Sequence, residues 1–121
     1  MTLTIYERNG GFPKIRRVVT AFYDRVLDSQ VVAHHFEQID IKRLIEHQTR
    51  FISFLMGGPA PGYTDEHLAH VHSRFGITLD EFDEMVELLT ETLEDFDFGA
   101  EDVAQIRNEL RKREPVIVSG R

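Results

Sequence analysis

The sequence predicts an all-α protein, with residues 1–121 forming a single domain. Apolar residues recur every three or four positions along most of the chain, as they do on one face of an α-helix, and no useful length shows strand-like alternation. A chain of 121 residues has room for one domain, and its 41% hydrophobic and 29% charged residues are typical of a globular protein. We expect four principal helices, one or two short ones and no sheet.

The first principal helix is expected over residues 13–28. Gly10-Gly11 interrupts the chain before it, and Pro13 suits a first helical turn. Its apolar stripe consists of Ile15, Val18, Val19, Phe22 and Val26. A short apolar cluster at 31–36 then predicts one or two turns.

The second principal helix follows Asp40, a suitable N-cap, and carries apolar residues from Ile41 to Met56. Gly57-Gly58-Pro59 is a strong stop signal, because glycine favours the end of a helix and proline does not continue it. Thr64 is an N-cap for a shorter helix that ends at Gly76. This helix places three apolar side chains on one side, those of Leu68, Val71 and Phe75.

The clearest helix start in the sequence is the capping box formed by Thr78 and Glu81, whose side chains satisfy each other's backbone N–H groups. It predicts the third principal helix, running to Phe96. A last helix is indicated by Val103, Ile106 and Leu110. Pro115 should kink or end it, and the apolar tail 116–118 is compatible with frayed helix or extended chain.

Charge and composition exclude several classes of function. Lys and Arg number 14 against 21 Asp and Glu, so the formal charge of −7 disfavours nucleic acid and anionic lipid as partners. The absence of cysteine excludes disulfides, Cys-ligated zinc, iron–sulfur clusters and covalent c-type haem. Residues 1–11 lack the apolar stretch of a signal peptide, and no apolar run approaches the roughly 20 residues of a membrane span. We therefore expect a soluble, cytoplasmic protein.

Two polar residues lie on or beside apolar stripes. Gln48 is four residues after Leu44 and four before Ile52, and a buried amide without partners costs about 1–3 kcal/mol. It therefore makes a structural hydrogen bond to a neighbouring helix or faces a polar ligand. Tyr23 flanks the stripe beside Phe22, where its hydroxyl either points inward or reaches solvent as a boundary residue.

Histidines are the candidate metal ligands. His72 shares a face with Leu68 and Phe75, which fits a satisfied core histidine or a ligand beside a flat apolar group. His47 lies about 60° around its helix from Leu44, so it either edges a pocket or faces solvent.

The remaining histidines are expected at the surface. His67 and His70 lie one turn apart, and with Glu66 they could clamp a metal, but the pattern favours a solvated face. His34 and His35 are expected as surface or loop residues rather than ligands.

In order and spacing, the landmarks of nearly the whole chain resemble those of the group I truncated haemoglobins. They are Ile5-Tyr6-Glu7-Arg8-Asn9-Gly10-Gly11, Phe22-Tyr23-Asp24-Arg25-Val26-Leu27, His35-Phe36, His47-Gln48-Thr49-Arg50-Phe51, Gly57-Gly58-Pro59, and His72 followed by Gly76-Ile77-Thr78. The resemblance implies a two-on-two helical sandwich around haem b, with paired glycines where the shortened chain turns.

The resemblance also implies roles for individual residues. His72 would be the proximal iron ligand, with its second ring nitrogen donating to a nearby acceptor. Phe36 would pack on the haem face, while Tyr23 and Gln48 would donate hydrogen bonds to a bound diatomic ligand. The other haem contacts it implies are Leu44, His47, Phe51, Val71, Phe75, Ile77, Phe82 and Val86.

This sequence departs from the family pattern at three points. Leu44 stands where other globins often keep a distal His or Gln, so hydrogen-bond donation would rest on Tyr23 and Gln48. His35 replaces the first residue of the usual Phe-Phe pair. Some relatives attach haem through a His in the last helix, but none is present there. Haem b is therefore expected to bind non-covalently.

The implied function is reversible binding of dioxygen, nitric oxide or carbon monoxide, with oxidation of nitric oxide to nitrate as an enzymatic extension that needs a separate reductase. A monomer or weak dimer is expected. Some relatives supply a second axial histidine at the position of His47. The alternative is therefore a bis-histidyl haem protein, with His72 and His47, for electron transfer or redox sensing. A helical interaction module without haem is a third hypothesis.

Overall fold

The computed structural model describes residues 2–59, 64–73 and 75–119, and within these ranges it contains helices and no strand. The helices are α1 (Ile5–Arg8), α2 (Gly11–Asp28), the 3-10 helix η1 (Ala33–Phe36), α3 (Ile41–Leu55), α4 (Asp65–Ser73), α5 (Leu79–Asp95), α6 (Ala100–Lys112) and α7 (Glu114–Ile117). None of these helices has the length and apolar character needed to cross a membrane.

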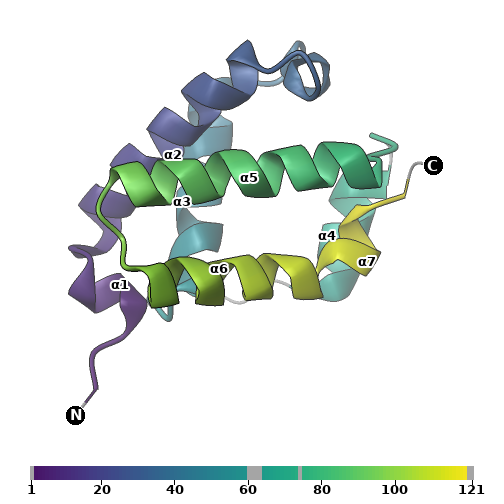
Figure 1. Cartoon of the computed structure of the whole chain (residues 1–121). Coiled ribbons are helices and arrows are strands. Elements are labelled where there is room, and N and C mark those ends of the chain that lie inside the picture. Colours follow the sequence, from purple (N-terminus) through teal and green to yellow (C-terminus); the bar gives the residue numbers. More distant parts are fainter. Residues whose placement is uncertain (1, 60–63, 74, 120–121) are drawn as a thin grey trace.

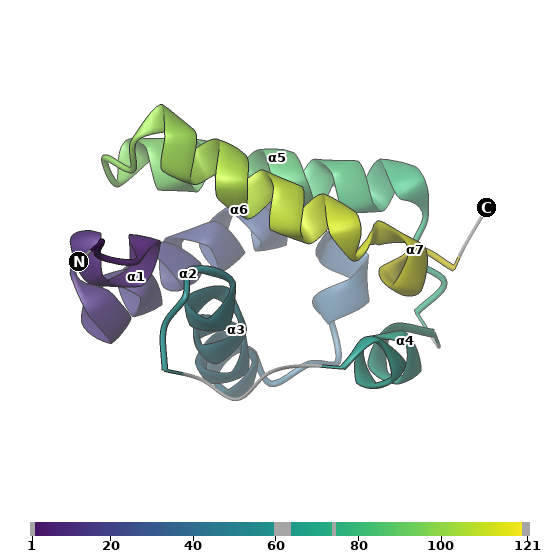
Figure 2. The ribbon, with the colours of Figure 1, turned by 90° about the horizontal axis from the view of Figure 1, so that it is seen from below.

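Two pairs of helices make up the body of the molecule. α5 and α6 run side by side in opposite directions, while α2 packs on α3 and passes behind one end of α5 (Figure 1). The view from below shows α3 and α4 on the same side of the α5–α6 pair, with α7 above α4 (Figure 2). Between them the pairs bury an aliphatic core, whose fully enclosed members include Ile15, Val18, Val19, Val26 and Ile106.

Each helix start that was predicted from a capping residue is confirmed. The Asp40 side chain accepts a hydrogen bond from the Arg43 N–H at 3.3 Å. Thr64 accepts one from the His67 N–H at 3.1 Å. The capping box at the start of α5 has both of its reciprocal bonds. Local side-chain chemistry therefore defines the starts of α3, α4 and α5.

Helix α1 was not predicted, although the sequence contains a signal for it. Thr4 and Glu7 form a second capping box, with the same spacing as the one before α5. The turn is attached to α3 by a hydrogen bond from the Tyr6 N–H to the Met56 carbonyl at 3.0 Å. The Tyr6 hydroxyl accepts from the Phe12 N–H at 3.1 Å. These bonds hold α1 where α2 begins and α3 ends.

The paired glycines act in two different ways. Gly10 and Gly11 have φ of 93° and 70°, a region that favours glycine, and α2 starts at Gly11, two residues before Pro13. Gly58 instead permits close packing, because a Cβ there would lie 2.6 Å from the Tyr6 ring and 2.9 Å from the Ser53 carbonyl oxygen. Gly57-Gly58 therefore serves the turn after α3 and also leaves room for α1.

The C-terminal segment bends at the proline and then continues as helix. α6 ends at Lys112, and α7 begins with Pro115 in its first turn, where its missing N–H costs nothing. The tail, for which the sequence left helix and extended chain open, is helical as far as Ile117. A hydrogen bond of 2.9 Å from the Ser119 N–H to the Ile77 carbonyl then ties it to the segment before α5. α7 packs against α4.

Candidate functional site

A cavity of about 660 Å³ opens among α2, α3, α4 and α5, a volume typical of pockets that hold an organic ligand. The structure brings all twelve sequence-predicted site residues to its wall. They are Tyr23, Phe36, Leu44, His47, Gln48, Phe51, Val71, His72, Phe75, Ile77, Phe82 and Val86. Most of these side chains are apolar, so the cavity suits a largely apolar ligand.

Other wall residues were not predicted. Leu110 and Ile117 close the cavity from the C-terminal end of the chain, and Arg43 and Asp40 add charge from the start of α3. The sequence did contain a signal for this part of the wall, because three consecutive apolar residues at 116–118 indicate a segment that packs against the protein. The position of Arg43 had no such signal.

His72 is the one histidine of α4 that is partly buried, whereas His67 and His70 are exposed. Its Nδ1 lies 2.7 Å from the Leu68 carbonyl oxygen one turn earlier, a distance at which Nδ1–H donates. Desolvation by burial lowers the pKa of the imidazole, and the nearby His67 adds to this effect against the opposing influence of the Leu68 carbonyl. A neutral ring that donates through Nδ1 keeps the lone pair of Nε2 for a metal.

Tyr23 is 4% exposed and comes from α2. Its ring lies edge-on to the rings of Phe22 and Phe36, with centroids 4.8 and 5.7 Å away. Burial raises the pKa of the phenol well above its ordinary value, so the hydroxyl keeps its proton near neutral pH. Within the described part of the chain this hydroxyl has no hydrogen-bond partner. It therefore remains available to donate to a ligand in the cavity.

Gln48 lies on α3, half-buried at the cavity wall. The sequence left open whether its amide bonds a neighbouring helix, and no such bond joins it to any described residue. The adjacent Thr49 bonds within its own helix instead, through its hydroxyl and the Ile45 carbonyl at 2.6 Å. His47 is exposed while also lining the cavity, which places it at the rim.

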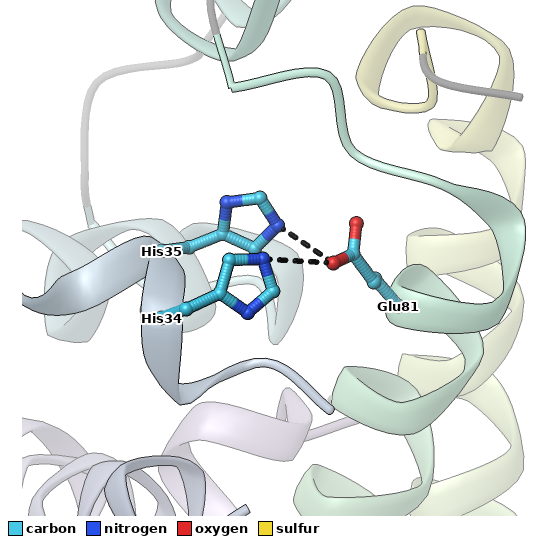
Figure 3. Close-up of side chains that lie close together, drawn as sticks. All are labelled: His34, His35 and Glu81. Carbon is cyan, nitrogen blue, oxygen red and sulfur yellow. Dashed lines mark ion pairs between the residues drawn. The ribbon is translucent and has the colours of Figure 1, made fainter. Parts of the chain in front are cut away.

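The other histidines divide into two groups. His67 and His70 are exposed, as expected, and His67 reaches the edge of the cavity. His34 is also exposed, but His35 is not a surface residue, because only 14% of its side chain is accessible. Its ring turns inward from η1 towards Glu81 of α5 (Figure 3). The expectation for His35 was wrong because sequence order alone did not reveal that η1 packs close to the start of α5.

These features together fit a haem. The apolar walls suit the faces of a porphyrin, and His72 offers an unprotonated ring nitrogen for iron. Tyr23 and Gln48, from two other helices, bring a hydroxyl and an amide to the same cavity. Such donors suit a small polar ligand on the metal.

Comparison with known proteins gives a consistent result. The bacterial-like globin family matches residues 4–117. A group 1 truncated haemoglobin of Mycolicibacterium paratuberculosis is 32% identical over 117 residues, covering 97% of this chain and 85% of that protein. The Fe(III) form of the truncated haemoglobin from Tetrahymena pyriformis superposes with a TM-score of 0.87 at 25% identity, covering 97% and 99% of the two chains. A 2/2 haemoglobin of Synechococcus, in the cyanomet state with covalently attached haem, has a TM-score of 0.81 at 25% identity, covering 95% and 98%.

Proposed function

This chain belongs to the bacterial-like globins, as a group 1 truncated haemoglobin, and we propose that it binds haem b non-covalently through His72 and holds a diatomic ligand beside Tyr23 and Gln48. Membership of the family implies haem binding and the two-on-two helical fold. The residue roles and the ligand chemistry are our proposal. Haem supplies the iron at which a diatomic ligand binds and, with dioxygen, the capacity to oxidise nitric oxide to nitrate.

One observation carries the proposal above the others: His72 lines the cavity with its Nδ1 hydrogen-bonded to the Leu68 carbonyl oxygen. This bond fixes the tautomer and the orientation of the ring, and it makes Nε2 a better ligand. Leu68 is itself 5% exposed, so water competes poorly for its carbonyl. His72 would thus present its Nε2 to the iron of a bound haem.

Tyr23 and Gln48 are proposed to govern the ligand. Each would donate a hydrogen bond to a ligand that carries partial negative charge, as dioxygen does on haem, and thereby slow its escape. The neighbouring Leu44 offers no donor at the cavity wall. Discrimination between dioxygen and less polar ligands would accordingly depend on Tyr23 and Gln48.

The apolar wall is proposed to hold the porphyrin without a covalent bond. Phe36 and Phe82 contribute rings from η1 and α5, and the rest of the wall is largely aliphatic and aromatic. The Synechococcus protein carries covalently attached haem, whereas helix α6 of this chain contains no histidine. We therefore propose dioxygen, nitric oxide and carbon monoxide as ligands of non-covalent haem, with a separate reductase returning the iron to the ferrous state.

The alternative is bis-histidyl coordination by His72 and His47, as in an electron-transfer or redox-sensing protein. The exposure of His47 favours a place at the rim, since the ring would have to turn from solvent into the cavity to reach iron. We therefore propose that the distal side stays open.

Absorption spectra of the purified chain with added haem test the proposal. We expect a stoichiometric haem complex, with a high-spin ferric form, a five-coordinate ferrous form and a large shift with carbon monoxide. A protein that leaves haem in its free spectrum would refute the proposed cofactor. Low-spin ferric and ferrous spectra without added ligand would establish the bis-histidyl alternative instead.

A further inference from the structure

A cluster outside the proposed haem ligands has the composition of a metal site. Within the described part of the chain, the ligand atoms of His34, His35 and Glu81 all lie within 4.8 Å of one another. The two histidines come from η1 and the glutamate from the first turn of α5, and Figure 3 shows both rings directed at the carboxylate.

The spacing of the ligand atoms suits a tetrahedral ion. The Nε2 atoms of His34 and His35 lie 3.2 and 3.0 Å from the same carboxylate oxygen, Oε2 of Glu81. In tetrahedral zinc, with bonds of about 2.0–2.1 Å, neighbouring ligand atoms are roughly 3.3–3.4 Å apart. Small side-chain movements would therefore seat an ion between these three atoms.

The remaining bonds of the cluster leave these atoms available. Glu81 receives the Thr78 N–H on its other oxygen, Oε1, at 2.9 Å, so capping of the helix does not occupy Oε2. The Nε2 of His35 is buried and meets the Glu81 carboxylate, whose Oε2 lies 3.0 Å away. A cation seated between them would replace this contact with bonds from both atoms to the metal.

We propose that His34, His35 and Glu81 form a binding site for a zinc-type divalent cation, separate from the iron site. Two imidazoles and one carboxylate are a common protein ligand set for zinc, with a fourth position left for water. The side chain of His34 is 54% exposed, so water reaches the outer side of the site.

The cation would fasten η1 to α5 at the wall of the haem cavity. His35 and Glu81 both line that cavity, and η1 also carries Phe36. Occupancy should therefore raise the thermal stability of the haem-loaded protein, because a cation that binds the folded state alone shifts the unfolding equilibrium. The site uses none of the residues proposed to bind haem or its ligand.

Calorimetric titration of tag-free, haem-loaded ferric protein with Zn²⁺ tests the site. We expect one Zn²⁺ per chain and a rise in melting temperature with added Zn²⁺. His34→Ala and Glu81→Gln should each weaken binding at least tenfold and abolish that rise. Neither change should prevent folding, since His34 is exposed and glutamine at position 81 can still complete the capping box.

His70→Ala is the matched control, because His70 is an exposed histidine of α4 outside the cluster. It should leave Zn²⁺ affinity unchanged. The proposal is overturned if no Zn²⁺ binds, if binding survives both cluster variants, or if it is lost in His70→Ala.

Discussion

Replacing Tyr23 with phenylalanine should speed the release of dioxygen from the ferrous protein roughly 10- to 150-fold. The substitution removes the hydroxyl and keeps the ring that packs against Phe22 and Phe36. A hydrogen bond to a charged or strongly polarised group contributes about 1.5–3 kcal/mol, and each 1.36 kcal/mol changes a rate tenfold. The hydroxyl has no partner among the described residues, so the stability of the haem-free protein should not fall.

Stopped-flow displacement of dioxygen by excess carbon monoxide measures this rate directly. Tyr6→Phe is the matched control, because its hydroxyl accepts a hydrogen bond from the Phe12 N–H instead of facing the cavity. That variant should lose some stability and keep the wild-type rate of dioxygen release. An unchanged rate in Tyr23→Phe would show that Tyr23 does not contact the ligand.

Three further substitutions probe the packing of α1, the start of α5 and the position of His47. Gly58→Ala should lower the free energy of unfolding by about 1–3 kcal/mol in chemical denaturation, since the new Cβ meets the Tyr6 ring and a backbone oxygen. Gly99→Ala is the control and should lower it less, because the space around its Cβ is open. Equal losses in the two variants would show that close packing at Gly58 does not matter. Thr78→Ala should cost about 1 kcal/mol by removing the N-cap of α5, and no loss would show that the cap is dispensable. His47→Ala should leave the ferric and deoxy-ferrous spectra unchanged, whereas a low-spin wild type that turns high-spin in this variant would place His47 on the iron.

The sequence predicted most where local chemistry decides structure. Asp40, Thr64 and Thr78 cap their helices as expected, because an N-cap depends on residues within one turn. The helical stripes also indicated most of the core, since periodic burial is a property of a single helix, but Val71 of the α4 stripe is 37% exposed. The capping box at Thr4 depends equally on neighbouring residues, but it was overlooked because the helix that follows it is a single turn.

Features that depend on packing between distant segments were harder to predict. His35 follows an exposed histidine in sequence, and only the approach of η1 to α5 explains why it is partly buried against Glu81. Gly58 was expected to serve a turn. Its lack of a side chain also leaves room for the ring of Tyr6, some 50 residues earlier in the chain. The residues of the cavity wall were predicted more fully. The resemblance to a known family indicated which residues of different helices meet in space, and periodicity within one helix cannot do so.

Haem retention by His72→Ala shows whether His72 holds the haem. His70→Ala is the matched control, as the same substitution on the same helix at an exposed position. Transfer of haem to an excess of apomyoglobin, followed by absorption, gives the dissociation rate of each variant. We predict loss at least tenfold faster from His72→Ala, with an altered ferrous spectrum, and wild-type behaviour from His70→Ala. Wild-type retention and a wild-type ferrous spectrum in His72→Ala would show that another residue holds the haem.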